Sequence, residues 1–151
     1  MNSNYYQQFV DIAKLYKKTD ELYHHIAVNL GISDASFWTL YSVCESKEPL
    51  TQNEIARNVG YPQQTIHSAI KKLEKSGLIY LEKKAVARNC KTVHLTEDGQ
   101  RYCNTHIFPT LKLTEECFDV LSEEELLLYL ELSKKVEVSM LNRLSDYIEK
   151  M

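Results

Sequence analysis

The chain has 151 residues, of which 44% are apolar and 26% charged, with only four glycines and three prolines. This length fits one domain, and the scarcity of glycine and proline favours a mostly helical fold. No apolar run approaches the roughly 20 residues that cross a bilayer, and the N-terminal residues lack the apolar core of a signal peptide. We therefore expect a cytoplasmic protein without a membrane partner.

Two helices are predicted at the N-terminal end. Apolar residues recur at helical spacing from Tyr5 to about Leu30, and Gly31 supplies a stop. A second helix is predicted to begin near Asp34, a suitable N-cap, and Pro49 prevents its continuation.

A short capped helix and a polar helix follow, separated by a glycine. Thr51 and Glu54 have the spacing of a capping box, which predicts a short helix that ends before Gly60 turns the chain. The next helix is predicted from Pro62, at its first helical position, to Gly77, which takes the left-handed conformation after its end.

The helix predicted over residues 62–76 has one apolar stripe and an opposite face of small polar and cationic side chains. The stripe, at i, i+3, i+4 and i+7, consists of Ile66, Ala69, Ile70 and Leu73. The opposite face carries Gln64, Ser68, Lys71 and Lys75, flanked by His67 and Lys72.

The pattern then changes towards a period of two. The segments "LIYLEKK" and "CKTVHL" are rich in β-branched and aromatic residues, and "AVARN" between them is a plausible hairpin tip. Thr96 predicts the cap of a further helix, which Pro109 bends or interrupts. Ser122 and Glu125 predict the capping box of a long final helix that ends near Glu149.

The net charge of −3 hides a strong asymmetry. Residues 55–92 contain eight basic and two acidic residues, a balance of +6, and residues 115–149 contain ten acidic and three basic residues, a balance of −7. The basic middle of the chain indicates a polyanionic partner.

Helix, tight turn, helix and hairpin are the element order of a winged helix-turn-helix, whose second helix enters the major groove. We predict base contacts from Gln63, Gln64, Thr65, His67 and Ser68. Phosphate or minor-groove contacts are predicted for Lys71, Lys72, Lys75, Lys83, Lys84, Arg88 and Lys91. The alternative for such a face is an ordinary solvated surface, but the capped helix, the glycine turn and the basic hairpin around it favour DNA binding.

The stretch "LTQNEIARNVGYPQQTIHSAIKKLEKSGLIYLEKK", followed by "KTVHLTEDGQ", resembles the MarR family of bacterial winged-helix transcription regulators. The resemblance implies a mostly α (α+β) fold and a single MarR-like domain over residues 1–151. Within it, residues 34–95 would form the DNA-binding lobe, and residues 1–30 and 110–151 the helical dimerisation region. The resemblance also implies a homodimeric repressor that binds double-stranded DNA at a pseudo-palindromic operator and is released by a small molecule or by oxidation.

The wing tip departs from the family pattern. Family members commonly carry Asp-x-Arg there, with the acid orienting the arginine towards the minor groove. Here these positions hold Ala87 and Asn89, with Arg88 between them. Arg88 takes the arginine's place with a shift of one residue, and the orienting carboxylate is absent.

The two end helices give an independent argument for a dimer. Both are apolar over more than one stripe, and a small winged domain offers little surface to cover them. A second copy of the chain would bury Phe9, Ile12, Leu130, Met140, Leu141 and Leu144.

Aromatic and sulfur-containing residues are candidates for sensing a signal. The resemblance implies a crevice for a small aromatic effector, with candidate lining residues Tyr16, Tyr23, Phe37, Trp38, Tyr41 and Tyr102. The alternative is that these residues belong to the core. Cys90 lies nearest to positive charge and is the leading redox candidate, but inert reduced thiols are the alternative for Cys44, Cys90, Cys103 and Cys117.

No cofactor, metal site or catalytic site is predicted. His24 or His106, with Cys103, lacks the further spaced ligands of a metal site. Cys103 and His106 lie at i, i+3 but have no third orienting group, so we expect no enzymatic activity. A winged helix that binds only protein is the more serious rival, and the salt dependence of DNA binding separates the two classes.

Overall fold

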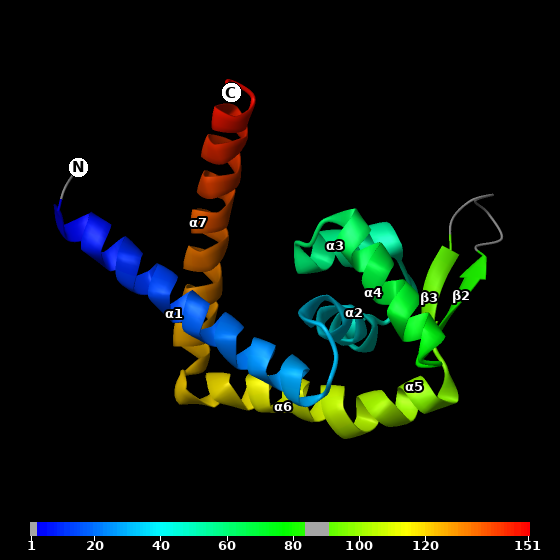
Figure 1. The fold of residues 1–151 in the computed structure, drawn as a ribbon. Helices are drawn as coiled ribbons and strands as arrows, with labels where there is room; N and C mark the ends of the chain where they lie inside the picture. The colour runs from blue at the N-terminus through cyan, green and yellow to red at the C-terminus, as the bar shows by residue number, and fades with distance from the viewer. Residues whose placement is uncertain (1–2, 84–90) are drawn as a thin grey trace. The chain divides into compact units, whose positions relative to one another are not determined.

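A computed structural model of the protein describes residues 3–83 and 91–151 (Figure 1). The chain divides into two compact units, residues 1–111 and residues 112–151. Every buried residue of the described chain lies in the first unit, which also holds all the described strands. Among the described helices, none combines the length and the apolar character needed to cross a membrane.

Apart from one short additional strand, β1, the first unit has the element order that the sequence predicts. Its helices and strands are α1 (Ser3–Asn29), α2 (Asp34–Glu45), β1 (Leu50–Thr51), α3 (Gln52–Val59), α4 (Gln63–Lys75), β2 (Ile79–Lys83), β3 (Lys91–Leu95) and α5 (Glu97–Tyr102). A π-helical turn (Cys103–Ile107) leads into α6 (Phe108–Glu116), whose last residues belong to the second unit. The predicted mostly helical winged helix-turn-helix fold is confirmed.

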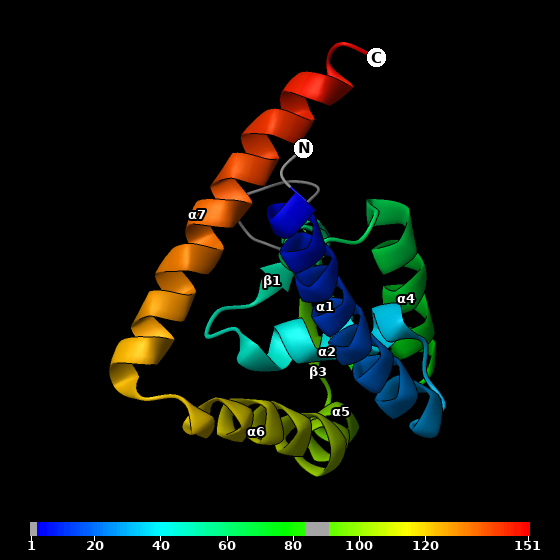
Figure 2. The same cartoon turned by 90° about the vertical axis from the view of Figure 1, so that its left-hand side faces the viewer.

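The second unit contains the end of α6, a short 3₁₀ turn (Cys117–Val120) and α7 (Glu123–Ile148), which is a single uninterrupted helix (Figure 2). The Ser122 hydroxyl accepts from the Glu125 N–H, and the Glu125 carboxylate accepts from the Ser122 N–H, so the predicted capping box is confirmed. None of the residues 112–151 is buried, so this unit has no core of its own.

The sheet has the strand order β1-β3-β2 and is antiparallel throughout. Ile79 pairs with Leu95 and Lys83 with Lys91, which confirms the predicted hairpin. The additional strand β1, which pairs Leu50 with Val93, is not predicted, because two residues are too few to show an alternating pattern. The hairpin tip, with Lys84, Arg88 and Cys90, lies outside the described residues.

Local signals set the turns around α3 and α4. The capping box of α3 is confirmed, since the Thr51 hydroxyl accepts from the Glu54 N–H and the Glu54 carboxylate accepts from the Thr51 N–H at 2.7 Å. Gly77 has a φ angle of 76°, the left-handed conformation predicted for it, and Gly60, which was predicted to turn the chain, is also left-handed at 69°.

Two predicted helix starts are wrong by one residue. Ser33 rather than Asp34 caps α2, because the Ser33 hydroxyl accepts from the Ser36 N–H at 3.2 Å. Asp34 is instead the first helical residue, and its carboxylate bonds to His24. Pro62 is the N-cap of α4, with an extended ψ of 140°, and not its first helical residue.

The interruption predicted at Pro109 takes the form of the π-helical turn. The N–H of Phe108 bonds to the carbonyl of Cys103, five residues back instead of four. Pro109 has no N–H to offer. The widened turn lets the helix continue as α6 where an ordinary proline break would end it.

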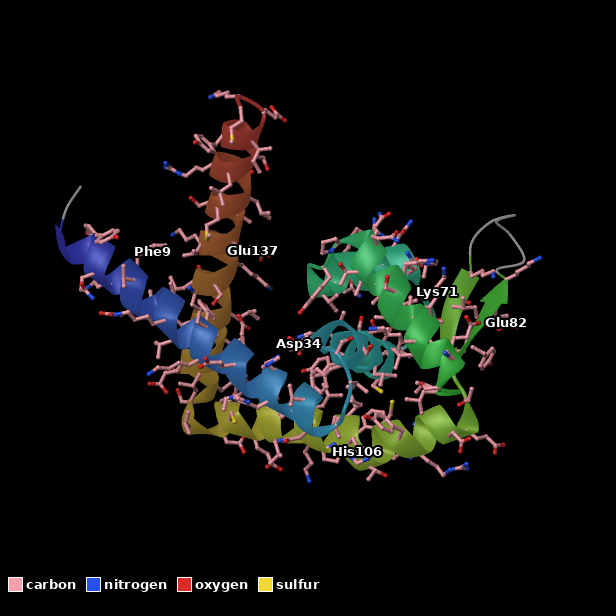
Figure 3. All side chains as sticks on the ribbon, in the orientation of Figure 1. Phe9, Asp34, Lys71, Glu82, His106 and Glu137 are labelled. Carbon is pink, nitrogen blue, oxygen red and sulfur yellow. The ribbon has the colours of Figure 1, made fainter. Side chains whose placement is uncertain are left out.

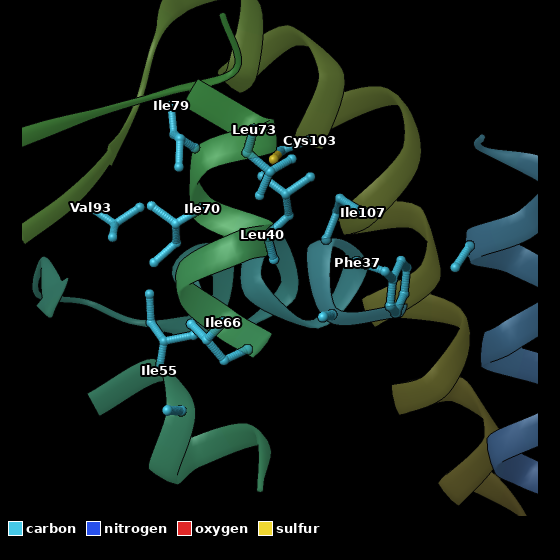
Figure 4. Close-up of a cluster of buried hydrophobic side chains, with 14 residues drawn as sticks. Phe37, Leu40, Ile55, Ile66, Ile70, Leu73, Ile79, Val93, Cys103 and Ile107 are labelled. Carbon is cyan, nitrogen blue, oxygen red and sulfur yellow. The ribbon is translucent and has the colours of Figure 1, made fainter. Parts of the chain in front are cut away.

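The core lies between α2, α3, α4, the sheet and the π-helical turn (Figure 4). The predicted apolar stripe of α4 is buried along its whole length, with no member more than 2% exposed: Ile66, Ala69, Ile70 and Leu73. They pack in one cluster with Leu40 of α2, Ile55 of α3 and Val93 of β3. Each large side chain buried this way contributes about 1.5–3 kcal/mol, so the cluster fixes which face of α4 points outward.

Gly99 occupies the tightest backbone contact among the described glycines. A side-chain carbon at this position would overlap the carbonyl oxygen of Leu78, which also accepts a hydrogen bond from the Thr96 N–H at 3.1 Å. We predict that Gly99→Ala lowers the free energy of unfolding by about 2 kcal/mol, since the strain of overpacking exceeds the gain in helix propensity. Urea unfolding followed by circular dichroism measures the change. Gln100→Ala, on the exposed side of α5, is the control and should stay within about 0.5 kcal/mol of the parent; equal stabilities for the two variants would contradict the prediction.

Candidate nucleic-acid interface

The buried stripe of α4 leaves its polar face outward. Gln63, Gln64, Thr65 and Ser68 are exposed, and His67 is half-buried. The predicted base-contacting residues therefore share one end of α4, and all except His67 are open to solvent. The Ser68 hydroxyl donates to the carbonyl of Gln64 at 3.0 Å, so its oxygen is left to accept from a partner.

The first turn of α4 differs from the first turns of the neighbouring helices. Side chains cap α2, α3, α5 and α7, whereas Pro62 makes no side-chain hydrogen bond to α4. The first amide groups of α4 thus have no side-chain acceptor, and the helix dipole adds partial positive charge there. Such a helix end is suited to a phosphate oxygen.

Cationic side chains continue along the outward face of α4. Lys71, which Figure 3 labels, is exposed. Lys72 and Lys75 are exposed too, and within the described part of the chain none of the three forms an ion pair. Thr65, Ser68 and Lys72 also border a shallow hollow beside the start of α2. Unpaired lysines on one face attract a polyanion without first having to break an internal salt bridge.

The wing adds two further cations. Lys83 and Lys91 are exposed and lie directly opposite each other in the hairpin register. Like charges at directly opposed positions destabilise a hairpin by a few tenths of a kcal/mol or more. An anion bound between the two side chains would relieve this repulsion, which fits the predicted phosphate contact.

The wing also contains a polar network that the sequence does not predict. His94 Nε2 lies 2.8 Å from the Thr92 hydroxyl and 3.3 Å from a Glu82 carboxylate oxygen. The Tyr80 ring stacks on the His94 ring with centroids 5.1 Å apart. The alternation of β2 and β3 is a signal for this cluster, but only the hairpin register brings these residues together.

The sequence also does not predict the role of Gln52, whose side chain bonds to two residues of α4. Its amide nitrogen donates to the carbonyl of Gln63 at 3.3 Å, and its amide oxygen lies 3.0 Å from Nδ1 of His67. The first bond fixes the amide orientation, so the oxygen must accept from an Nδ1–H. The neutral His67 ring then presents Nε2 as an acceptor, which matches the amino groups of adenine or cytosine.

The predicted sensing residues separate into groups. Tyr23, Phe37, Trp38 and Tyr41 form one aromatic cluster with ring centroids 4.7–6.0 Å apart. Phe37 is fully buried and belongs to the core, whereas Trp38 and Tyr41 line a cavity of about 450 Å³.

Two of the six predicted aromatic residues do not line that cavity and lie outside the cluster. Tyr16 is 55% exposed. Tyr102 packs on His106 with ring centroids 4.7 Å apart, and its buried hydroxyl finds no hydrogen-bond partner in the described part of the chain. The predicted set of six therefore does not form one site.

Two of the described cysteines, Cys44 and Cys103, lie beside each other. A hydrogen bond to the Cys103 side chain, followed by burial, raises the pKa of the Cys44 thiol. Among the described residues, His, Cys, Asp and Glu form no group of three that could hold a metal ion. The Cys103 thiol lies beside the Cys44 thiol, and the His106 ring packs on Tyr102. Cys103 and His106, which the sequence places at i, i+3, therefore have different neighbours.

Comparison with known proteins identifies relatives. The sequence profile of the MarR family matches residues 30–88. An uncharacterized HTH-type transcriptional regulator of Bacillus cereus is 31% identical over 120 residues, which are 79% of each chain.

Solved structures share the fold at lower identity. A protein described as a MarR family transcriptional regulator from Listeria monocytogenes, in complex with a 26-mer DNA, has a TM-score of 0.72 at 22% identity, with 89% of each chain covered. A Staphylococcus aureus MarR in complex with salicylate and kanamycin has a TM-score of 0.70 at 17% identity, covering 93% of this chain and 95% of that one.

The Gln52 contact predicts an unusual histidine tautomer. At a pH where His67 is neutral, we expect its hydrogen on Nδ1, and Gln52→Leu should shift the ring towards the Nε2–H form, because the acceptor is lost. The ¹⁵N chemical shifts of the imidazole distinguish the two forms. Gln63→Ala is the control, since it keeps the backbone carbonyl that holds Gln52. The same tautomer in Gln52→Leu and in the parent would contradict the assignment.

Proposed function

Because this chain belongs to the MarR family of transcriptional regulators, we propose that it is a homodimeric repressor that binds a pseudo-palindromic operator in double-stranded DNA. A small-molecule or oxidative signal would release it. In this proposal, residues 34–95 form the DNA-binding lobe, and residues 1–30 and 110–151 form the dimerisation region.

One observation carries the DNA-binding role: α4 combines a buried apolar stripe with an outward face that is amide-rich at its uncapped start and cationic towards its end. The side chains of the first half suit base edges, while its backbone N–H groups and the lysines of the second half suit phosphates. The Listeria protein of the same fold, solved with DNA, supports this assignment. A winged helix that binds only protein would not require unpaired lysines along this face.

DNA binding provides the test of the two roles on α4. We expect the affinity for operator DNA to fall steeply with salt, because each neutralised phosphate releases counterions. Gln64→Ala should reduce the preference for operator over random DNA, whereas Lys72→Ala should weaken both about equally and lower the salt slope by about two, one for each protomer of the dimer. Fluorescence anisotropy with labelled duplexes measures the affinity for operator DNA, the affinity for random DNA and the dependence of both on salt.

Lys112→Ala serves as the control, because Lys112 lies in the second unit, 3.8 Å from Glu116. It should leave both affinities unchanged. Weak binding at every salt concentration would favour the protein-binding alternative, and identical behaviour of Gln64→Ala and Lys72→Ala would contradict the division of roles.

The dimer is proposed from uncovered apolar surface. No residue of α7 is buried, and its exposed apolar side chains include Leu127 (61% exposed), Leu141 (59%) and Leu144 (52%). On α1, Phe9 and Ile12 are 58% and 53% exposed. Apolar surface this extensive is rare on a monomer, and a second copy of the chain would cover it. A two-fold dimer places its half-sites about one DNA turn, ~34–36 Å, apart.

Sedimentation equilibrium tests the dimer. The parent should sediment as twice the chain mass of 17.6 kDa. Leu141→Glu should raise the dimer dissociation constant by about 100-fold, since the two-fold axis duplicates the loss of apolar burial. Ser139→Glu adds the same charge on the opposite side of α7 and should have a much smaller effect. A monomeric parent protein would contradict the proposal.

A further inference from the structure

The cavity beside Trp38 is walled by three helices of the first unit. Asp20 and His24 come from α1, Trp38 and Glu45 from α2, and Tyr61 from the turn that follows α3. Its volume of about 450 Å³ lies in the range of small-molecule sites. Figure 3 shows where Asp34 begins α2, close to α1.

Aromatic rings form one side of the cavity. Trp38 and Tyr41 have centroids 5.1 Å apart and planes inclined by 60°, so the two rings meet as a corner instead of stacking flat. Tyr61 adds a third ring, and all three are half-buried. The faces of such rings carry negative electrostatic potential and attract organic cations, tryptophan most strongly.

Carboxylates also line the cavity. They belong to Asp20, Asp34 and Glu45, and among the residues that the structure describes no lysine or arginine lines the cavity. His24 Nδ1 lies 3.0 Å from both oxygens of Asp34, so this carboxylate already has a partner. Asp20 and Glu45 are therefore the two carboxylates of the cavity that we expect to interact with a bound ligand.

Two tyrosines of the cavity have raised pKa values, and the carboxylates contribute to both shifts. Burial, followed by Tyr23 and Glu45, raises the pKa of Tyr41 to about 12. Burial, followed by Asp34 and Asp20, raises the pKa of Tyr61. Burial is the main cause at both hydroxyls, and the nearby carboxylates add to it by disfavouring a further negative charge.

The positive side chains nearby belong to a neighbouring hollow. Lys14, Lys17 and Lys18 line a more open surface depression that shares Asp20, His24 and Asp34 with the cavity. Glu45, Trp38 and Tyr41 do not line that depression. The site for a cation is therefore the end of the cavity formed by these three residues, away from the lysines.

We propose that this cavity binds an organic cation, a quaternary or protonated amine carried on an apolar body, with the positive charge between Glu45 and the rings of Trp38 and Tyr41. An aromatic carboxylate of similar size would meet like charge there. That such a ligand acts as the effector rests on the proposed function, whereas cation binding itself does not. Tyr61 links the cavity to DNA reading, because it directly precedes Pro62, the N-cap of α4.

The protein carries a built-in probe for the test. Trp38 is its only tryptophan, so its fluorescence reports on this cavity alone. The full-length protein is titrated with phenyltrimethylammonium, with its neutral isostere tert-butylbenzene and with benzoate. We expect a saturable change with the cation, binding at least about tenfold weaker for the neutral compound, and no saturable change with benzoate.

Isosteric variants locate the charge. Glu45→Gln should weaken cation binding by about fivefold, in line with a partly exposed ion pair, and combining it with Asp20→Asn should weaken binding by about tenfold or more. Glu48→Gln is the matched control, because Glu48 lies three residues further along and does not line the cavity. Circular dichroism checks that each variant is folded.

Three results would overturn the proposal: benzoate binding as tightly as the cation, Glu45→Gln binding as tightly as the parent, or no saturable change with any probe. Operator binding measured without ligand keeps the two proposals apart. If the protein binds DNA but no cation, only this inference is wrong. If it binds the cation but no DNA, only the proposed function is wrong. If both hold, the cation should lower operator affinity, and an unchanged affinity would exclude the effector role.

Discussion

Burial of a single narrow stripe on α4 is the constraint on which the rest of the structure depends. Ile66, Ala69, Ile70 and Leu73 occupy one side of a helix with 3.6 residues per turn. A change of register by one residue would rotate the helix by about 100° and bring His67 or Lys71 towards the core, at a cost of several kcal/mol. The stripe therefore selects one orientation, and the outward position of the amides and lysines follows from the packing beneath them.

The sequence predicts this part of the fold well because its signals are local. The capping box of Thr51 and Glu54 and the left-handed glycines need only a few neighbouring residues. The features that the sequence did not predict correctly depend on contacts between distant residues or on competition between neighbouring residues for the same role. β1 exists only because β3 lies beside it, and Ser33 displaces Asp34 as a cap because both residues can serve.

The candidate sites show the same division. Periodicity alone places Gln64 and Lys71 on the outward face, but the bond from Gln52 to His67 spans 15 residues and requires the angle between α3 and α4. Spacing within α2 cannot separate Phe37 in the core from Trp38 in the cavity, because the difference arises from which helices pack against each side. The cavity carboxylates look like ordinary surface acids until α1, α2 and α3 are assembled.

The turn between α3 and α4 joins the two sites through the backbone. Tyr61 lines the cavity, and its N–H bonds to the carbonyl of Ala56 at 3.2 Å, while Pro62 sets the first turn of α4 without a side-chain cap. The backbone N–H groups at the start of α4 are thus positioned by this turn together with the Gln52 bond to the carbonyl of Gln63 and the buried Ile66. A ligand that binds better when Tyr61 has moved favours states in which these amides are displaced. A tenfold loss of operator affinity requires a difference of only about 1.4 kcal/mol between the two states, comparable to one cation–π contact.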